Sequence, residues 1–369
     1  MARQQINSQE DFENKFTRTN VGELNLSFRD TDFNIDIEVK ETVNQASFYN
    51  CNFHKDFCLN TTVNKSITID ECIFEKEFDI QNSKFLGKAR LQRCHFKGET
   101  YFSNSSFSDL ADFWRSTFYK KTIFYKVDFN KTTVFSAATF KENVLFTYTL
   151  IEKLIIFRGT KVEKGFDLSL AIISGKIGLF NFNLKNYESI DKKITEDVYE
   201  NSVSVTAEIP VKNKRETFRI LKDNLESQKN LAESLEFKTI EKQILLKELW
   251  VDLNFPRFFD VLNLGLNWLS NKNGNSYGRA FLFTAGFGLL FFYFSLISLD
   301  RFSFTIIPSE WAFDISFRYF MEFLNPIHKF DYLGTETDLS KGFYVLDFTG
   351  KAFIGYGIYQ FIQAFRKYK

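Results

Sequence analysis

The fold of this chain is decided between Cys72 and Phe124, where the sequence reads CIFEKEFDIQNSKFLGKARLQRCHFKGETYFSNSSFSDLADFWRSTFYKKTIF. Large apolar residues recur here at alternating steps of six and five residues, and the pattern extends from about Ile69 to Leu179. It consists of two series, each with a period of eleven residues. The first series contains Phe74, Phe85, Phe96, Phe107, Phe118, Phe129 and Phe140; the second begins at Ile80 and Leu91 and continues with Phe102, Phe113, Phe124, Phe135 and Phe146. Nothing else in the sequence has order over so long a range.

A period of eleven residues also occurs in right-handed helical supercoils. In an α-helix, however, residues six apart lie about 240° apart around the axis, so the two series would lie on different faces. The residues between them are mostly Asn, Ser, Thr, Asp and Lys, which are poor helix formers. A small or β-branched residue stands two positions before most of the large ones, as Ser105 does before Phe107. Because residues two apart in a strand point the same way, the pattern predicts short strands that send one large and one small side chain inward and then turn.

This pattern resembles the pentapeptide-repeat family, whose chains wind as a right-handed, four-sided (quadrilateral) β-helix with Leu or Phe at the centre of each five residues. The resemblance implies such a solenoid for residues 24–185, in which two elevens make one turn and equivalent residues of successive turns stack. The phenylalanines of both series would form its core. The alternation of five and six departs from the family's regular five, and the repeat is ragged before Val63. We expect residues 1–23 to form an N-terminal cap, with Phe12 and Phe16 on a short helix.

The charge of the repeat region argues against one function known in this family. Some soluble members are acidic mimics of duplex DNA that bind topoisomerases, which requires a negative surface in place of phosphates. Residues 1–185 contain 25 Lys plus Arg and 23 Asp plus Glu, and the whole chain has a net charge of +1. A DNA-mimicking topoisomerase binder is therefore the least favoured alternative, and we do not expect a nucleic-acid partner.

The sequence lacks the motifs of common catalytic sites. It has no Gly-rich phosphate loop, no Cys-x-x-Cys, no HExxH and no Gly-x-Ser-x-Gly. Its four cysteines, among them Cys72 and Cys94 at equivalent inward positions, are interpreted as small buried residues rather than as a disulfide or metal site. We therefore expect no enzyme activity, no cofactor and no metal.

Beyond the repeats, residues 186–214 are polar and are interpreted as a linker. Residues 215–250 carry apolar stripes at helical spacing and predict a helical hairpin that breaks near Ser227 to Asn230. The run Glu-Thr-Phe-Arg-Ile-Leu-Lys, 216–222, with the later Glu241, looks like the segment that joins pentapeptide repeats to a membrane domain in membrane-associated members of the family. An ordinary hairpin packed on the end of the solenoid is the alternative.

Residues 251–369 are predicted to form a two-span α-helical membrane domain. The segment 280–299 is twenty residues without a charge, enough to cross a hydrocarbon core of about 30 Å. The second span, 343–365, contains Asp347 and Lys351, which either pair with each other or lie near the interface. An apolar stripe at 255–269 lies in the headgroup plane or packs on the hairpin. Lys272 and Arg279 precede the first span and a basic tail follows the second, so both termini are expected in the cytoplasm.

The segment between the spans suggests a pore or interface. Residues 311–324 predict a short helix that ends at Asn325 and Pro326. The residues that follow, 327–331, do not match the Thr-Val-Gly-Tyr-Gly filter of potassium channels. His328, the one histidine outside the repeats, stands near Asp331 and Glu322 in the sequence, too little for a nucleophile or metal site. The candidate pore or interface residues are Trp311, Asn325, Pro326, His328, Asp347 and Lys351.

These observations predict a non-enzymatic, multi-pass protein of the bacterial inner (cytoplasmic) membrane. Its cytoplasmic β-helix would be a rigid platform for an unidentified protein partner or for self-assembly, and its partners would be the lipid bilayer and further copies of the chain, as a homo-oligomer. The closing sequence, 355–368, again looks like bacterial membrane pentapeptide-repeat proteins. The main alternative is an oligomeric channel-like pore, or a membrane-disrupting stress or defence effector, gated by the β-helix.

Overall fold

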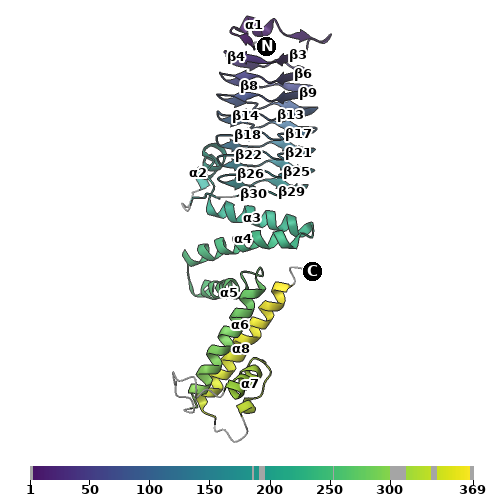
Figure 1. The fold of residues 1–369 in the computed structure, drawn as a ribbon. Coiled ribbons are helices and arrows are strands. Elements are labelled where there is room, and N and C mark those ends of the chain that lie inside the picture. The colour runs from purple at the N-terminus through teal and green to yellow at the C-terminus, as the bar shows by residue number, and fades with distance from the viewer. Residues whose placement is uncertain are drawn as a thin grey trace. The chain divides into compact units, whose positions relative to one another are not determined.

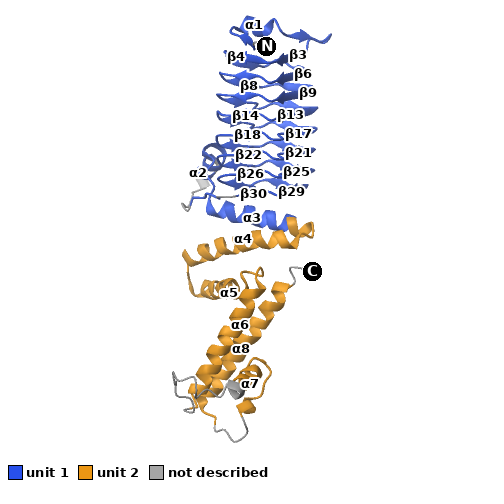
Figure 2. Ribbon diagram, in the orientation of Figure 1, with its two compact units in different colours: residues 1–224 blue, residues 225–369 orange. Residues whose placement is uncertain are grey.

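A computed structural model describes residues 3–184, 187–190, 196–251, 253–299, 313–333 and 339–365. The chain divides into two compact units, residues 1–224 and residues 225–369 (Figure 2). The first unit is a parallel β-solenoid and the second is helical (Figure 1). The strands of the solenoid, between Gln4 and Leu184, are here called the tube.

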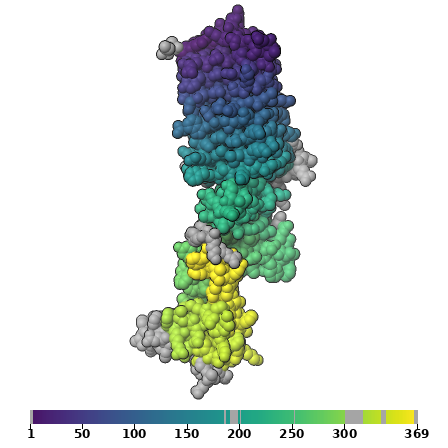
Figure 3. All heavy atoms as spheres, turned by 90° about the vertical axis from the view of Figure 1, so that its right-hand side faces the viewer, coloured from purple at the N-terminus to yellow at the C-terminus, as the bar shows by residue number. Residues whose placement is uncertain are grey.

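Between Thr31 and Gly178 the tube makes seven turns, each with strands on four faces, and further strands precede and follow them (Figure 1). Figure 3 shows the turns as bands of colour that run from purple to teal. The first face contains β1 (Gln4–Ile6), β4 (Thr31–Phe33), β7 (Asn52–Phe53), β10 (Ile73–Phe74), β14 (His95–Phe96), β18 (Thr117–Phe118), β22 (Thr139–Phe140), β26 (Lys161–Val162) and β30 (Asn183–Leu184). The second contains β5 (Ile37–Val39), β8 (Phe57–Leu59), β11 (Phe78–Asp79), β15 (Thr100–Tyr101), β19 (Thr122–Ile123), β23 (Val144–Leu145) and β27 (Phe166–Asp167).

The third and fourth faces belong to one sheet, because three longer strands turn the corner between them. These are β3 (Leu24–Arg29), β6 (Val43–Tyr49) and β9 (Thr62–Asp70). After β9 the third face continues as β12 (Lys84–Phe85), β16 (Ser106–Phe107), β20 (Asp128–Phe129), β24 (Leu150–Ile151) and β28 (Ile172–Ile173). The fourth continues as β13 (Lys88–Gln92), β17 (Ala111–Asp112), β21 (Thr132–Val134), β25 (Leu154–Ile156) and β29 (Lys176–Gly178). β2 (Thr17–Arg18) pairs with β3 and is antiparallel.

The register of the strands confirms the predicted stacking and explains the ragged beginning. Phe74 pairs with Phe96, and Phe96 pairs with Phe118, so each of these turns advances by the two elevens that the sequence predicts. Earlier turns are shorter. Phe33 pairs with Phe53 and Phe53 pairs with Phe74. The first of these turns therefore contains 20 residues, which is four steps of five, and the second contains 21. The later turns have one additional residue on each of two faces.

The alternation of five and six corresponds to two kinds of corner. The five-residue corners between Ile80 and Val162 pass through a residue with positive φ, such as Asn82 (56°), Asn104 (57°) and Gly159 (66°). No residue within the six-residue corners between Phe74 and Phe157 has positive φ. A left-handed residue lets the chain reverse in fewer positions, which accounts for the shorter of the two corners.

The core of the tube is made of stacked aromatic rings. Phe113 lies on Phe135 with ring centroids 4.7 Å apart, and Phe124 lies on Phe146 at 4.8 Å. The small inward residues add a second ladder. The hydroxyl of Ser105 donates to the carbonyl of Ile80 at 2.6 Å, and the hydroxyls of Ser116, Thr149 and Thr160 make equivalent bonds. These buried hydroxyl groups are therefore satisfied inside the tube.

The N-terminal end of the tube is covered by α1 (Gln9–Glu13). Phe12 is fully buried, and its ring stacks on that of Phe28 with centroids 5.4 Å apart. β1 lies inside the predicted cap but pairs in parallel with β4, so the strands of the tube begin earlier than the predicted residue 24.

The predicted linker, 186–214, is partly folded against the tube. It contains α2 (Glu196–Asn201), a π-helical turn η1 (Ser202–Thr206) and the beginning of α3 (Val211–Ser227). Val203 and Ile209 pack with Ile123 and Leu145 of the tube, which is the physical reason that this segment is not a free linker.

The second unit contains α4 (Leu231–Val251), α5 (Phe255–Asn271), α6 (Tyr277–Ile297), α7 (Phe313–Phe323), a 3-10 turn η3 (Phe330–Leu333) and α8 (Lys341–Phe365). α3 and α4 are separated by residues 228–230, where the sequence predicted a break. α6 and α8 lie side by side (Figure 1). A Cβ on Gly357 would lie 2.3 Å from the hydroxyl of Thr284, so a glycine is needed for this approach of the two helices.

Within the described residues one helix, α6, is long and apolar enough to cross a membrane by length and composition. α8, which covers the predicted second span, does not meet the same test. Its charged residues, Asp347 and Lys351, and its glutamines make it less apolar than α6.

Candidate functional site

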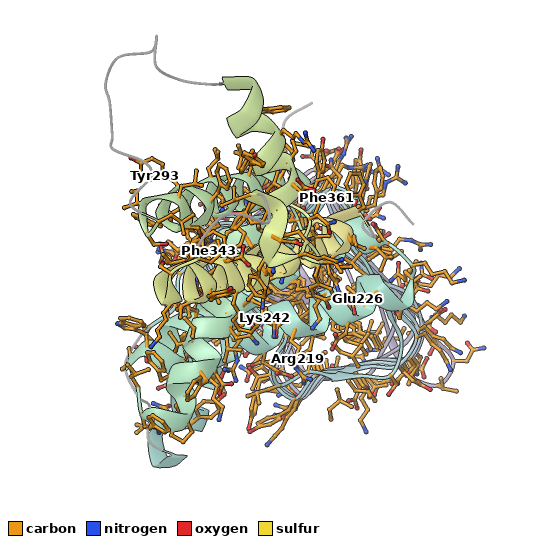
Figure 4. All side chains as sticks on the ribbon, turned by 90° about the horizontal axis from the view of Figure 1, so that it is seen from below. Arg219, Glu226, Lys242, Tyr293, Phe343 and Phe361 are labelled. Carbon is orange, nitrogen blue, oxygen red and sulfur yellow. The ribbon has the colours of Figure 1, made fainter. Side chains whose placement is uncertain are left out.

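The structure brings together four of the six residues predicted as a pore or interface. Asn325 and His328 follow α7, and Asp347 and Lys351 lie on α8. Pro326 lies near Gly355 of α8, with its Cβ 4.0 Å from the position that a Cβ on the glycine would take. Trp311 lies outside the described residues. Figure 4 shows the side chains of this unit, with Phe343 and Phe361 toward the two ends of α8.

The centre of the site is the carboxylate of Asp347, which is fully buried. Nε2 of His328 lies 2.8 Å from Oδ1 of Asp347, and Nζ of Lys351 lies 2.9 Å from Oδ2. The side chain of His328 is 1% exposed and that of Lys351 is 15% exposed. Each oxygen of the carboxylate thus faces one nitrogen, and the three residues form a buried ionic cluster, called the His328–Asp347–Lys351 cluster below.

The protons of the His328 ring follow from its neighbours. Nδ1 lies 2.7 Å from the carbonyl oxygen of Asn325, which only accepts, so Nδ1 carries a proton and donates it. Nε2 faces the carboxylate of Asp347, and a hydrogen bond there needs one proton between the two atoms. With that proton on Nε2, the ring is an imidazolium; with it on Oδ1, the carboxyl group donates to a neutral ring.

Aromatic rings surround the cluster. The ring of Tyr332 lies edge-on to His328 with centroids 4.8 Å apart, and that of Phe323 lies 5.3 Å away. Nζ of Lys351 lies 3.8 Å above the ring of Phe330, a cation–π contact. Such a poorly hydrated site makes an unpaired charge costly. The cluster therefore binds the chain after α7 to α8.

The three side chains of this cluster can hold charge and protons. Among the described residues, no hydroxyl or thiol is hydrogen-bonded to His328. In the part of the chain that the structure describes, no group of three or more His, Cys, Asp or Glu side chains could hold a metal ion. The arrangement fits a structural or proton-holding role.

Sequence reasoning did not find the partner of His328. It considered Asp331 and Glu322, whereas the histidine pairs with Asp347, which is 19 residues away. The signal was present, because a lone histidine and an Asp–Lys pair four apart interrupt otherwise apolar segments. Their pairing depends on how the chain around His328 packs against α8.

A second polar cluster was also missed. Asn267 and Asn271 of α5 meet Gln360 of α8, and the Gln360 amide donates to Oδ1 of Asn267 at 2.8 Å. The hydroxyl of Tyr356 donates to the same oxygen at 3.1 Å. Asn271 is 2% exposed and Gln360 is 4% exposed. The amides face each other because the faces of α5 and α8 that carry them are buried together.

The tube places all of the predicted core phenylalanines inside. Each of the following is at most 1% exposed: Phe74, Phe85, Phe96, Phe102, Phe107, Phe113, Phe118, Phe124, Phe129, Phe135, Phe140 and Phe146. Outside, opposite charges pair between neighbouring turns, as in Lys97 with Glu75 and Lys164 with Glu142, both at 2.8 Å. The tube thus presents a surface of mixed charge.

Residues 80–128 match the family model described as "Pentapeptide repeats (9 copies)". No curated protein and no solved structure has significant similarity to the chain. The matched residues lie within the middle turns of the tube, where strands on four faces stack in parallel and in a constant register. The match and the stacked turns agree, and the middle of the tube consists of pentapeptide repeats.

Proposed function

We propose that this chain is an integral membrane protein whose second unit inserts α6 and α8 into the bilayer and whose tube is a platform for protein binding. The main support for the proposal comes from which side chains of these two helices are exposed and which are buried. In the most apolar stretch of α6, 33% of the residues are buried inside the structure. The core helix of a soluble protein is mostly buried, so this exposure favours lipid as the solvent of α6.

The distribution of exposed and buried residues around α8 supports the same proposal. Val345 is 66% exposed and Phe348 is 68% exposed, whereas Asp347 between them is fully buried. One turn from the end, Ile362 is 53% exposed and Gln360 is 4% exposed. A helix in water shows the reverse distribution. Ionisable residues of membrane helices face the interior of the bundle, as Asp347 does.

α5 completes the proposed membrane domain as a helix in the headgroup plane. Its exposed residues include Phe255 at 80%, Phe259 at 57% and Leu269 at 49%. Such an apolar stripe on a helix with Asn and Asp on its other side is typical of interfacial helices. Lys272 and Arg279 flank the start of α6, and by the positive-inside rule they favour a cytoplasmic location for that end of the helix. The chain would then lie in the inner membrane with both termini cytoplasmic.

The proposed role of the tube is binding rather than catalysis. Solenoids offer extended surfaces at fixed spacing, and the mixed charges of this one suit a protein partner or another copy of the chain better than nucleic acid. The tube exposes few large apolar residues, among them Leu86 at 50% and Phe180 at 68%.

The alternative of an oligomeric pore finds less support. From Phe281 to Ile297 on α6, and from Tyr344 to Phe365 on α8, the exposed residues are apolar, aromatic or glycine. The charged residues of α8 between these limits face inward. Copies that met through these exposed residues would have few polar side chains, such as the half-buried Gln363, with which to line a water-filled passage.

The proposal is tested by flotation of membranes from cells that produce the full chain, after an alkaline carbonate wash. We expect the chain to float with the lipid and to resist the wash. The variant Leu289→Arg with Phe348→Arg, which changes two exposed apolar positions, should lose most of the floating fraction. Val21→Arg on the tube, where the wild-type valine is 78% exposed, is the matched control and should float like the wild type. Recovery of the folded wild-type chain in the soluble fraction would overturn the proposal.

A further inference from the structure

An apolar groove of about 420 Å³ lies between α5 and α6. Phe283 closes it on the inner side and is 6% exposed, while Leu282 at 69% and Leu290 at 45% form its open rim. Gly286 lies on its wall, and a Cβ added there would meet nothing within 4 Å. The groove is lined by Trp268, Leu269, Arg279, Leu282, Phe283, Gly286, Phe287 and Leu290.

Arg279 is the positively charged residue among those that line the groove. The guanidinium of Arg279 lies 5.4 Å from the centre of the Trp268 ring, which holds it at the lining. Among the described residues, this guanidinium has no ion-pair or hydrogen-bond partner, and no carboxylate lines the groove. A guanidinium stacked on an indole keeps its N–H groups free at the edge, where they can bind a phosphate with two parallel hydrogen bonds.

We propose that this groove binds an anionic phospholipid, with an acyl chain between α5 and α6 and the phosphate on Arg279. The proposal rests on the proposed membrane insertion and names the lipid that the inserted unit selects. The groove is apolar along the exposed side of α6 and carries its single positive charge near the N-terminal end of that helix, as a lipid with one anionic headgroup requires. A soluble apolar ligand would leave Arg279 without a counter-charge, and a free phosphate would leave the apolar wall uncovered.

The test measures quenching of Trp268 by brominated lipids. The full chain carries Trp114→Phe, Trp250→Phe and Trp311→Phe, so that its fluorescence comes from Trp268 alone. It is reconstituted in zwitterionic bilayer discs that contain increasing fractions of phosphatidylglycerol or phosphatidylcholine with brominated acyl chains. We expect half-maximal quenching at a fraction of the anionic lipid about tenfold lower than for the zwitterionic one. Both headgroups carry a phosphate, but the choline of phosphatidylcholine already neutralises it, whereas phosphatidylglycerol leaves its negative charge to Arg279.

Two variants assign the quenching to the groove. Arg279→Gln should remove the preference for the anionic lipid and leave the zwitterionic curve in place. Gly286→Leu places a side chain in the groove at a position where its Cβ meets nothing within 4 Å, and it should lower the quenching by both lipids. Gly265→Leu on α5 is the matched control, since a Cβ there also meets nothing within 4 Å and the residue does not line the groove. It should behave like the parent.

The outcomes separate the two proposals. If the parent floats with lipid but both brominated lipids quench it at the same fraction, the lipid site is overturned and membrane insertion stands. The lipid site is also overturned if Gly286→Leu quenches like the parent. If the parent does not float with lipid, membrane insertion fails and the lipid site fails with it.

Discussion

The side-chain amide of Asn224 makes both backbone hydrogen bonds that a further strand would make to Ile177. Its Nδ2 donates to the carbonyl of Ile177 at 2.8 Å, and its Oδ1 accepts from the N–H of Ile177 at 3.1 Å. Ile177 lies in β29, the last strand of its face. One amide on α3 thus helps to close the C-terminal edge of the tube, which protects it from edge-to-edge association.

We expect Asn224→Ala to expose the amide of Ile177. The variant loses both of these hydrogen bonds, and each typically contributes about 0.5–1.5 kcal/mol. Hydrogen–deuterium exchange of the full chain should show faster exchange in the peptide that contains β29. Asn60→Ala, at an exposed asparagine, should leave exchange at its own turn unchanged. Equal exchange of β29 in Asn224→Ala and wild type would contradict the strand-like role of the amide.

The aromatic core should be sensitive to the loss of one ring. Phe124 is fully buried and stacks on Phe102 with centroids 4.6 Å apart. We expect Phe124→Ala to lower the free energy of unfolding of the tube by about 3–5 kcal/mol, because it leaves a cavity in a packed column. Lys131→Ala, at an exposed position nearby, should change it by less than about 0.5 kcal/mol. Urea unfolding followed by exchange of the tube amides measures both, and equal small effects would place Phe124 outside the core.

One glycine in a six-residue corner should not tolerate a side chain. A Cβ on Gly98 would lie 1.9 Å from the carbonyl oxygen of Lys76 in the preceding turn. Since both groups belong to the backbone, Gly98→Ala has to move one turn against the next, and we expect a loss of about 1–3 kcal/mol in stability. Gly178→Ala is the control, because its nearest neighbour would be 3.7 Å away, an ordinary contact. Thermal unfolding of the two variants should differ in that order.

The His328–Asp347–Lys351 cluster should respond more to the loss of one member than to the loss of all three. Asp347→Leu leaves two buried nitrogens without a counter-charge, and we expect it to lower stability by about 3–5 kcal/mol. The triple variant with His328→Phe and Lys351→Leu removes the charges together and should recover much of the loss. Thermal unfolding in detergent compares them.

The control for the cluster is Asp331→Leu, because Asp331 is exposed and does not pair with His328. It should unfold at nearly the wild-type temperature. A triple variant that is less stable than Asp347→Leu alone would contradict this prediction. It would mean that the three side chains stabilise the unit by more than the neutralisation of one another's charge.

The thiols should differ in reactivity with pH. Burial raises the pKa of Cys94 to about 12, so at pH 8 only about one part in 10,000 is the reactive thiolate. Cys58 is partly exposed. We expect iodoacetamide at pH 8 to modify Cys58 and to leave Cys94 intact. At pH 9.5 only about one part in 300 of Cys94 is thiolate, so it should still react far more slowly than Cys58. Mass spectrometry identifies the modified residue, and urea should make both react. Early modification of Cys94 in the folded chain would contradict its burial.

Much of the tube could be predicted because its pattern is local. Each short strand carries its own large residue, such as Phe96, and its own small one, such as Cys94, and the step to the next turn is a count of residues. The shorter turns before Phe74 were harder to predict. A change in turn length moves the positions at which the large residues recur but does not change the residue types. The packing of Val203 on Leu145 was not predicted, since the polar sequence around Val203 hides its few buried residues.

The sequence by itself determined the solenoid, the apolar helix α6 and the candidate residues of the cluster, because these depend on periodicity, on length and on residue type. The tertiary structure decided which side of α8 faces outward, that His328 pairs with Asp347, and that Asn224 closes β29. These contacts join residues that are 19 and 47 positions apart. Such pairings depend on how turns and helices pack, and no local spacing in the sequence encodes that geometry.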